Sequence, residues 1–488
     1  MGGLSKLLPN GKILCAGGTQ IPNSGYDSDL LLTQFNTDGS IDTDFGDNGI
    51  SATDYNNKFE DVLAMCLVGD KIQVSINMEG GNDKAAGFKR FNADGSLDTT
   101  FGDGGFAFHS IEGMHLMIIN MLTLPNGKIL AVGDAVDNNS NLLRHWYVGR
   151  YNADMTLDTT FANGLGYWIE PVAGGNNNVR KVAVNTDGKI IVAGRKQVVV
   201  WDGFVVMQFN EDGTVDETFG VEGTTMFHFA DFVDYLYGLQ LQPDGKILLS
   251  GGVTYTQTPF GGADFCMARL NTSGSLDTSF GVGGKIIYDM NLTQSETSND
   301  ILLRGNGKMV IGGLMSVNGQ YDTGLLFLNQ DGSPDTLFGP DGRVTTDFND
   351  GETNVYESIY NLNEQPDGKI VASGNTVINN IPASTLARYN VEQPTASVQQ
   401  QGLDKSVNVY PNPVSNVLYI KFNLPQEQDA QIKLFSVNGQ EIATDYSGAK
   451  VSVNNNTIAL NNFAALSKGM YLVQVTAGNT TQTFKVVK

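Results

Sequence analysis

The sequence predicts an all-β protein in which a seven-bladed β-propeller precedes a small Ig-like β-sandwich. Two short signatures recur with a period of about 60 residues through the first 390 residues, and a sequence of different character follows them. Glycine accounts for 58 of 488 residues, well above its average share of about 7%. Abundant glycine between short apolar runs is typical of many short strands joined by tight turns.

The first signature is a turn, then a lysine, then a short apolar run. It reads Pro-Asn-Gly-Lys-Ile-Leu at residues 125–130 and Pro-Asp-Gly-Lys-Ile-Leu at residues 243–248, and its Gly-containing pair supplies turn chemistry. Its lysine occurs seven times: Lys12, Lys71, Lys128, Lys189, Lys246, Lys308 and Lys369. Because each copy of a repeat builds one structural unit, the sequence predicts seven blades.

The second signature falls between successive lysines and stays in phase with them. It reads Asp-Gly-Ser-Leu-Asp-Thr-Thr-Phe-Gly at residues 94–102. Its phenylalanine occurs six times: Phe45, Phe101, Phe161, Phe219, Phe280 and Phe338. Two different signatures that keep one period indicate a repeat protein rather than chance similarity.

One period contains four expected strands. In the fifth copy these are residues 237–242, 246–250, 265–271 and 285–289, with the second signature in the loop before the last of them. None of these segments has the 3.6-residue periodicity of a helix. Four antiparallel strands repeated radially are typical of a propeller blade. The first blade is expected to begin with a strand at residues 4–8, and the seventh to end at residues 385–390.

This pattern resembles the delta-60 repeat family of bacterial surface and secreted proteins and, less closely, NHL-type propeller repeats. The resemblance covers about residues 4–390. Two copies depart from it: the turn before Lys71 lacks the proline, and Phe161 is followed by Ala162 instead of glycine. The resemblance implies a propeller in an extracellular setting and implies no particular activity.

The aspartates of the second signature suggest a calcium loop. The acidic residues that we consider as weak calcium candidates are Asp38, Asp42, Asp94 and Asp98. An EF-hand loop needs glycine at its sixth position and glutamate at its twelfth, which this spacing does not match. Asp38 and Gly39 form a turn by side-chain-to-backbone bonding, Asp42 caps the next turn, and Phe45 fills the space between blades. We therefore predict structural loops and neither metal nor cofactor.

Catalytic motifs are absent from the sequence. The histidines His109, His115, His145 and His228 follow no metal-ligand spacing, and neither a GxSxG elbow nor a Walker loop occurs. Aromatic residues that are able to stack on sugars are Trp146, Trp168, Trp201, Tyr235 and Tyr237, although such residues more often fill the spaces between blades. The sequence predicts a non-enzymatic binding or scaffold protein. The alternative is a carbohydrate-active enzyme or lectin with acids and aromatics at the central funnel.

Charge and hydropathy exclude further classes of protein. The chain has 30 basic and 52 acidic residues, a formal charge of −22, whereas a nucleic-acid binder needs clustered Lys and Arg. No apolar run approaches the roughly 20 residues of a transmembrane helix.

A second module follows the repeats. Residues 1–390 are assigned to the propeller, the polar residues 391–405 to a linker and residues 406–488 to a small sandwich. Its expected strands are residues 417–422, 431–437, 457–460, 470–476 and 483–487. Motifs typical of a sorting signal include Tyr410, Pro411, Asn412, Pro413, Gly439, Gly469, Tyr471, Lys485 and Lys488.

These motifs resemble the type A C-terminal sorting domain of the type IX secretion (Por) system of Bacteroidetes. The resemblance implies export across the outer membrane, with the translocon and its sortase-like processing machinery as partners. It also implies removal of the tail, followed by release or by attachment to surface lipopolysaccharide. Such cargo needs an N-terminal signal, which residues 1–6 lack. We expect the chain to be a fragment whose missing upstream part supplies the fourth strand of blade 7.

Overall fold

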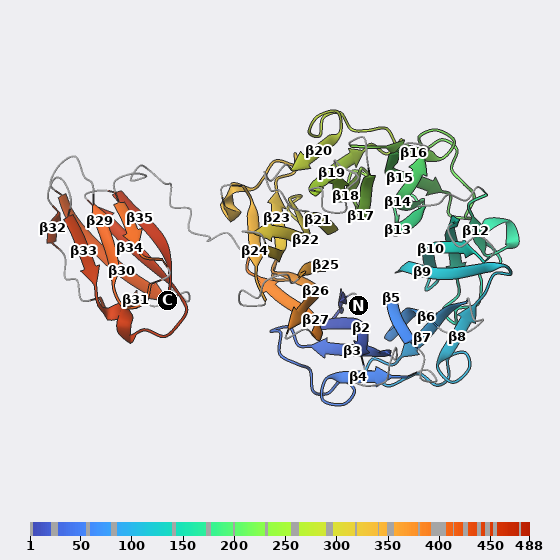
Figure 1. Ribbon diagram of the computed structural model, residues 1–488, viewed down its shortest axis with the longest axis horizontal. Coiled ribbons are helices and arrows are strands. Elements are labelled where there is room, and N and C mark those ends of the chain that lie inside the picture. Colours follow the sequence, from blue (N-terminus) through green and yellow to red (C-terminus); the bar gives the residue numbers. More distant parts are fainter. Residues whose placement is uncertain are drawn as a thin grey trace. The chain divides into compact units, whose positions relative to one another are not determined.

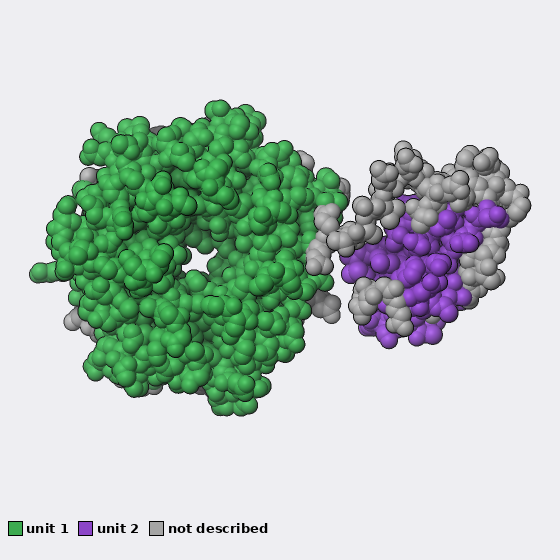
Figure 2. Space-filling model, turned by 180° about the vertical axis from the view of Figure 1, so that it is seen from behind, with its two compact units in different colours: residues 1–392 green, residues 393–488 purple. Residues whose placement is uncertain are grey.

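The computed structural model divides into two compact units, residues 1–392 and residues 393–488 (Figures 1 and 2). The structure describes residues 3–20, 28–54, 59–79, 85–138, 143–171, 177–198, 201–229, 233–254, 263–288, 296–317, 320–339, 341–348, 356–378, 381–391, 407–412, 414–422, 428–436, 441–444, 449–451, 456–477 and 480–488.

The first unit is a ring of seven blades, each of three or four antiparallel strands (Figure 1), and a parallel bridge between Asp202 and Val233 joins blades 4 and 5 into one eight-stranded sheet. The strands of blades 1 to 4 are β1 Leu4–Leu7, β2 Ile13–Gln20, β3 Ser28–Phe35 and β4 Ile50–Thr53; β5 Phe59–Val68, β6 Lys71–Glu79, β7 Ala86–Phe91 and β8 Phe106–His109; β9 Met114–Thr123, β10 Ile129–Asp137, β11 Arg144–Tyr151 and β12 Tyr167–Ile169; and β13 Asn178–Val184, β14 Ile190–Val198, β15 Trp201–Phe209 and β16 Thr224–Phe227. Those of blades 5 to 7 are β17 Val233–Leu241, β18 Ile247–Thr254, β19 Ala263–Leu270 and β20 Lys285–Tyr288; β21 Thr297–Leu303, β22 Met309–Val317, β23 Gln320–Leu328 and β24 Arg343–Thr346; and β25 Ser358–Glu364, β26 Ile370–Ile378 and β27 Ile381–Tyr389. The predicted seven-bladed propeller is confirmed.

Strands β17 and β18 of blade 5 are longer than the sequence suggested. The glycine pair after Ser250 looks like a strand end, yet β18 continues to Thr254. A Cβ on Gly251 would lie 1.8 Å from the carbonyl oxygen of Tyr235, so the glycine permits the two strands to approach closely. The same close approach accompanies a shift in strand register between Leu236 and Gly238, which is the mark of a β-bulge.

The two sequence signatures meet inside each of blades 1 to 6. The lysine of the first signature forms an ion pair with the second aspartate of the other signature: Lys12–Asp42 at 2.6 Å, Lys71–Asp98 at 3.6 Å, Lys128–Asp158 at 2.6 Å, Lys189–Asp216 at 2.9 Å, Lys246–Asp277 at 2.9 Å and Lys308–Asp335 at 2.7 Å. The pair ties the second strand of a blade to the loop that leads into its fourth strand.

The aspartate of this pair is also a hydrogen-bond hub. Asp277 is buried, accepts hydrogen bonds from the amide and hydroxyl of Ser279, and pairs with Arg269 at 2.7 Å. The hydrogen bonds from Ser279 and Lys246 hold the pKa of Asp277 well below its usual range. The loop is therefore fixed by one carboxylate that stays ionised at neutral pH.

The phenylalanine of the second signature joins neighbouring blades. Phe45 is 1% exposed, and a Cβ on Gly95 of the next blade would lie 2.8 Å from its ring. The amide of Gly46 also donates to the carbonyl of Asp94 at 2.7 Å. Where alanine replaces this glycine, Ala162 adopts a φ of 50° and still donates to the carbonyl of Asp212 at 2.7 Å. The departure at Ala162 thus leaves the contact between blades intact.

Blade 7 lacks the second signature, and the ring closes through side chains. The amide of Ser5 donates to Oδ1 of Asn361 at 3.0 Å, and the hydroxyl of Ser373 donates to the carbonyl of Gly3 at 3.1 Å. In this blade the repeat lysine, Lys369, contacts its neighbour Asp367 instead. Within the described ranges no strand pairs with the outer side of β27. Because residues 392–406 lie outside those ranges, the unpaired edge stays a prediction.

The second unit consists of two sheets that share a core. One contains β28 Val407–Tyr410, β29 Leu418–Phe422 and β33 Asn456–Leu460; the other contains β30 Gln428–Ser436, β31 Glu441–Ile442, β32 Ala449–Val451, β34 Met470–Ala477 and β35 Thr480–Val487. Ile420, Leu434 and Val473 are completely buried in the core between them. The small β module that the sequence predicted is confirmed, with β28, β31 and β32 added to its expected strands.

Replacement of Asp277 by alanine is expected to lower the free energy of unfolding by about 3 kcal/mol, because it leaves buried donors without an acceptor. The matched control is Asp367→Ala, which removes an exposed aspartate beside the repeat lysine of blade 7 and is expected to cost less than about 0.5 kcal/mol. Urea unfolding followed by circular dichroism measures both. Equal losses in the two variants would contradict the role assigned to Asp277.

Candidate functional site

A cavity lies at the centre of the ring, where Figure 2 shows an opening through the first unit. Its volume is about 310 Å³, and the innermost strands of all seven blades contribute to its lining. In each of blades 2 to 7, the innermost strand has one residue at a register shift, and the side chain of that residue lines the cavity. These residues are Leu63, Ile119, Arg180, Tyr237, Asn299 and Tyr360. A bulge directs its extra residue away from the ladder, and here that residue faces the cavity.

The lining is positively charged, although the whole chain carries a charge of −22. Lys6, Arg180 and Lys181 all line the cavity, and its described lining contains no carboxylate. Lys181 lies 3.0 Å from Asp300, which is on the same ring of inner strands. Burial lowers the pKa of Lys6, and the nearby charge of Lys181 adds to this shift. Because Asp300 balances the charge of Lys181 and burial disfavours the charged form of Lys6, Arg180 is the lining residue on which an anion site would chiefly depend.

Tyr237 of the cavity lining packs beside Tyr235 on the same strand, β17. The rings of Tyr235 and Tyr237 are stacked with their centroids 6.2 Å apart. The guanidinium of Arg180 lies 5.4 Å from the ring of Tyr237, and that of Arg195 lies 4.5 Å from Tyr235. Alternating arginines and tyrosines present both charge and flat apolar faces.

The other predicted aromatic candidates lie elsewhere. Trp146 is completely buried in the core between blades 3 and 4, and Trp168 packs edge-on against Phe209 with centroids 5.0 Å apart. The side chain of Trp201 lies outside the described part of the chain. Of the four candidates whose side chains are described, Tyr237 alone lines the cavity.

The four calcium candidates occupy loops of blades 1 and 2. Asp38 accepts hydrogen bonds from the amide and hydroxyl of Ser40 at 2.9 and 2.7 Å, and these bonds lower its pKa. Asp94 makes the same two bonds with Ser96. The carboxylates of both residues are thus engaged within their own turns.

The second aspartate of each loop has protein partners too. Asp42 binds Lys12 and accepts a hydrogen bond from Gln34 at 2.5 Å. The hydrogen bond from the Thr100 hydroxyl, despite the opposing effect of burial, lowers the pKa of Asp98 to about 2. These contacts explain the positions of the candidates without a bound ion, and the absence of calcium there stays a prediction.

The histidines stand on separate elements. The His109 ring lies 2.5 Å from the hydroxyl of Tyr151, and burial lowers the pKa of His109 to about 4. His115 contacts Asn77, and His145 contacts the carbonyl of Glu170 at 2.7 Å. Among the described residues no histidine belongs to a group of side chains close enough to share a metal ion.

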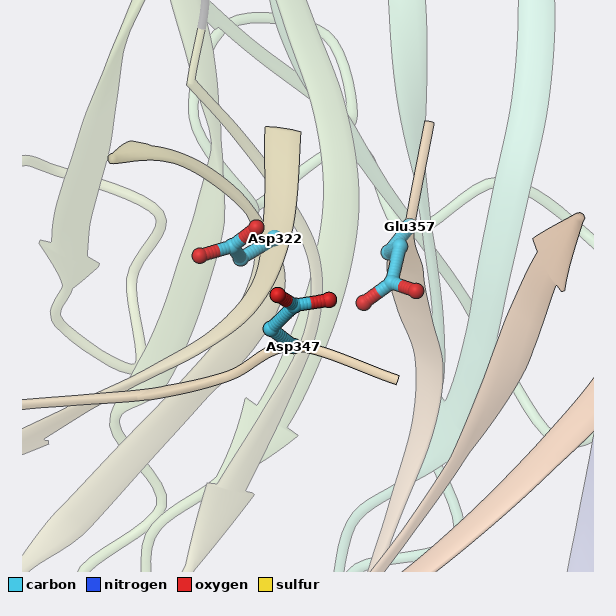
Figure 3. A group of neighbouring side chains, drawn as sticks. All are labelled: Asp322, Asp347 and Glu357. Carbon is cyan, nitrogen blue, oxygen red and sulfur yellow. The ribbon is translucent and has the colours of Figure 1, made fainter. Parts of the chain in front are cut away.

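One acidic group was missed by the sequence interpretation. Asp322, Asp347 and Glu357 come together between blades 6 and 7 (Figure 3). The signal that could have found them is a spacing: an aspartate pair 25 residues apart recurs at 29/54, 264/289 and 322/347, each followed by a glutamate. This pattern lies outside both signatures, which drew attention to the turns.

The sorting residues of the second unit gather at one corner of the sandwich. The side chain of Asn412 accepts a hydrogen bond from the amide of Val487 at 2.8 Å and donates to the carbonyl of Lys485 at 3.0 Å. Gly469 and Lys488 exchange two backbone hydrogen bonds of 2.9 and 2.8 Å. Asn412 thereby links the segment after β28 to β35 of the other sheet.

The remaining sorting residues support this corner. Tyr410 stacks on Tyr419 with centroids 5.8 Å apart, and the peptide bond before Pro411 is cis. The hydroxyl of Tyr471 donates to the carbonyl of Ser467 at 2.8 Å. The predicted positions Pro413 and Gly439 lie outside the described residues.

Two family models match the chain, one in each of the two compact units. Residues 408–488 match the secretion system C-terminal sorting domain. Seven segments match a β-propeller domain of unknown function (DUF5122): residues 8–45, 80–101, 124–161, 186–219, 242–280, 304–338 and 365–391. The chain contains seven DUF5122 β-propeller repeats and a type IX sorting tail. No curated protein matches it.

Solved structures resemble the DUF5122 propeller only distantly. Puromycin hydrolase is 9% identical with a TM-score of 0.44, over 87% of this chain and 59% of that one. The polysaccharide lyase Uly1 is 11% identical with a TM-score of 0.44, over 80% and 90%. The β-propeller domain of the Trilobed protease from Pyrococcus furiosus is 10% identical with a TM-score of 0.39, over 80% and 97%. Similarity at this level supports no statement about activity.

The sorting tail determines where the DUF5122 protein acts. It is exported by the type IX secretion machinery to the cell surface or the extracellular space. The described residues include no helix of the length and apolarity that a bilayer crossing requires.

Replacement of Asn412 by alanine removes both hydrogen bonds that join Asn412 to β35, and is expected to destabilise the tail by about 1 kcal/mol. The control is Lys433→Ala, which removes an exposed ion pair with Glu441 worth less than about 0.5 kcal/mol. Thermal unfolding of the full chain and the yield of exported protein measure the effect. Wild-type behaviour of the Asn412 variant in both assays would show that the corner does not depend on this side chain.

Proposed function

We propose that this exported protein is a binding protein whose propeller takes an anionic ligand in its central cavity. The observation that carries the proposal is the group of Lys6, Arg180 and Lys181 in the cavity lining of a strongly acidic chain. Scattered surface lysines would not favour one ligand site, whereas convergent cations in a concave site do.

The tyrosines narrow the ligand class to acidic glycans. The apolar faces of sugar rings stack on aromatic rings, and Tyr237 presents such a ring beside Arg180. Arginine binds carboxylate and sulfate groups through paired hydrogen bonds. A carboxylated or sulfated oligosaccharide offers both features, and it is available outside the cell.

Binding is favoured over the enzymatic alternative by the chemistry of the lining. Glycosidases commonly use two carboxyl groups separated by about 5–10 Å. The described lining of the cavity offers ammonium, guanidinium, amide and phenol groups instead. These groups hold an anion but do not supply the acid and base of that reaction.

Titration calorimetry with uronic-acid oligosaccharides tests the ligand class. We expect binding that is weakened about tenfold or more by Arg180→Ala, because a hydrogen bond to a charged group contributes about 1.5–3 kcal/mol. The control is Lys433→Ala, which makes the same change of charge in the other unit. Neutral oligosaccharides should bind more weakly. Equal binding of neutral and acidic oligosaccharides would contradict an anion site.

Export is tested separately, in cells with a type IX system and behind an inner-membrane leader. Removal of residues 406–488 is expected to leave a folded propeller in the periplasm, and fusion of residues 391–488 to a periplasmic protein should export it. Cleavage is expected within residues 391–410, since exposed linkers are cut in preference to folded blades. Fractionation and the mass of the exported species measure this. Normal export of the shortened chain would contradict the sorting role.

A further inference from the structure

Three carboxylates from two blades converge at the junction of blades 6 and 7. Asp322 lies on β23, Asp347 follows β24 and Glu357 precedes β25. Figure 3 shows the three side chains as neighbours, with the carboxylates of Asp347 and Glu357 turned toward each other. One carboxylate oxygen from each lies within 4.8 Å of the others. An ion with oxygen ligands at about 2.4 Å can touch two oxygens that are up to about 4.8 Å apart.

The same three positions are acidic at the junction of blades 1 and 2. Asp29 and Asp54 occupy the places of Asp322 and Asp347, because Leu30 pairs with Thr53 as Thr323 pairs with Thr346. Glu60 takes the place of Glu357.

The equivalence extends to burial. Glu60 and Glu357 are buried, whereas Asp54 and Asp347 are exposed. The hydrogen-bond donors differ: the carboxylate of Glu60 accepts from the amide of Leu30, whereas that of Glu357 accepts from the amide of Phe348 and from the hydroxyl of Thr376 at 2.7 Å. The two junctions therefore share the positions and burial of their acids.

A cation occupies the copy at blades 1 and 2. The ammonium of Lys89 is completely buried, lies 2.6 Å from the Glu60 carboxylate and donates to the hydroxyl of Thr53 at 3.0 Å. Burial lowers the pKa of Lys89, and the carboxylates of Glu60, Asp54 and Asp29 oppose that shift. The acidic set thus accommodates a positive charge in this very protein.

Alanine stands at the position of Lys89 in blade 7. Lys89 pairs with Val74, three residues after the repeat lysine; the corresponding pair in blade 7 is Ala372 and Ala387. The hydroxyl of Tyr389 contacts that of Thr346 at 2.8 Å, which replaces the hydrogen bond made by Lys89 but not its charge. The junction of blades 6 and 7 thus has the three acidic residues but no lysine at the position of Lys89.

The acidity of this set reflects the missing charge. Burial raises the pKa of Asp322, and the neighbouring Asp347 adds to the shift. Burial also raises the pKa of Glu357, to which both aspartates contribute in the same direction. Three carboxyl groups that oppose one another's ionisation would be stabilised by a cation placed among them.

Two acids of a related set, Asp264 and Glu296, lie between blades 5 and 6, and the third position, Asp289, lies outside the described residues. Glu296 is completely buried, and neither of its carboxylate oxygens has a hydrogen-bond partner of standard geometry among the described residues. Burial raises the pKa of Glu296 to about 7, and Asp264 contributes to this increase while Arg343 opposes it. Arg343 itself forms an ion pair with Asp341. The position of Lys89 is taken here by Leu326.

We propose that the acidic set at the junction of blades 6 and 7 binds Ca²⁺, in the place that the Lys89 ammonium fills between blades 1 and 2. All its ligands are oxygens, which hard cations prefer, and they come from two blades. The bound ion would join neighbouring blades. The affinity expected of such an extracellular site is in the range of about 0.1–1 mM.

Equilibrium dialysis of the full chain with ⁴⁵Ca²⁺, after treatment with a chelator, is the direct test. We expect one ion per wild-type chain and none in Glu357→Gln. Thermal unfolding should shift upward by several degrees when Ca²⁺ is added to the wild type, because a ligand of the folded state stabilises it. The glutamine variant should be about as stable as the wild type without Ca²⁺, because the repulsion that it removes offsets the weaker hydrogen bonds to Thr376 and Phe348. This result separates loss of a site from loss of folding.

The most discriminating variant is Ala387→Lys, which places a lysine in blade 7 at the position that Lys89 occupies in blade 2. It is expected to remove the Ca²⁺ without a loss of stability in the chelator. Asp38→Asn, in an exposed turn, is the control and should bind one ion. Retention of the ion in Glu357→Gln and in Ala387→Lys would overturn the proposal, and so would a wild type that binds no Ca²⁺. Loss of the ion in the Asp38 variant would assign it to the turns instead.

Discussion

The ion pair between the repeat lysine and the second aspartate of each loop is the contact on which the propeller depends. It explains why two signatures that lie far apart in the sequence keep the same period, since the lysine of one binds the aspartate of the other. The aspartate positions the loop, and the loop positions the phenylalanine that reaches the next blade. The ion pair inside one blade thus fixes the position of the phenylalanine that packs between this blade and the next.

Positions outside this ion pair and its loop differ between blades, and the residues of the cavity and of the acidic junctions lie at such positions. The bulged residue of the inner strand is leucine in blade 2, arginine in blade 4 and tyrosine in blades 5 and 7. The junction acids are likewise present at some blades and absent from others. Function in such a ring is thus expressed by differences between repeats, whereas stability comes from what the repeats share.

Much of the architecture could be predicted from the sequence because turn chemistry and apolar runs are local signals. The strands of blade 5 and the seven blades followed from them. The extension of β18 through Gly251 could not be predicted, because the close approach to Tyr235 is a tertiary contact. Nor could the cavity lining: Arg180 and Tyr237 are unremarkable in their strands, and only the register shifts direct them inward. The junction acids come from different blades, and their proximity requires the ring to be closed.

The junction of blades 1 and 7 lacks the apolar contact that a phenylalanine of the second signature would bring. At blade 1, Gly39 occupies the place of Gly95, yet a Cβ there would meet no described atom within 4 Å, because no phenylalanine arrives from blade 7. A hollow of about 560 Å³ lies at this junction instead. Local opening requires least free energy where the fewest apolar contacts must be broken. The seam between blades 1 and 7 is accordingly a place where we expect local opening of the ring to require little free energy.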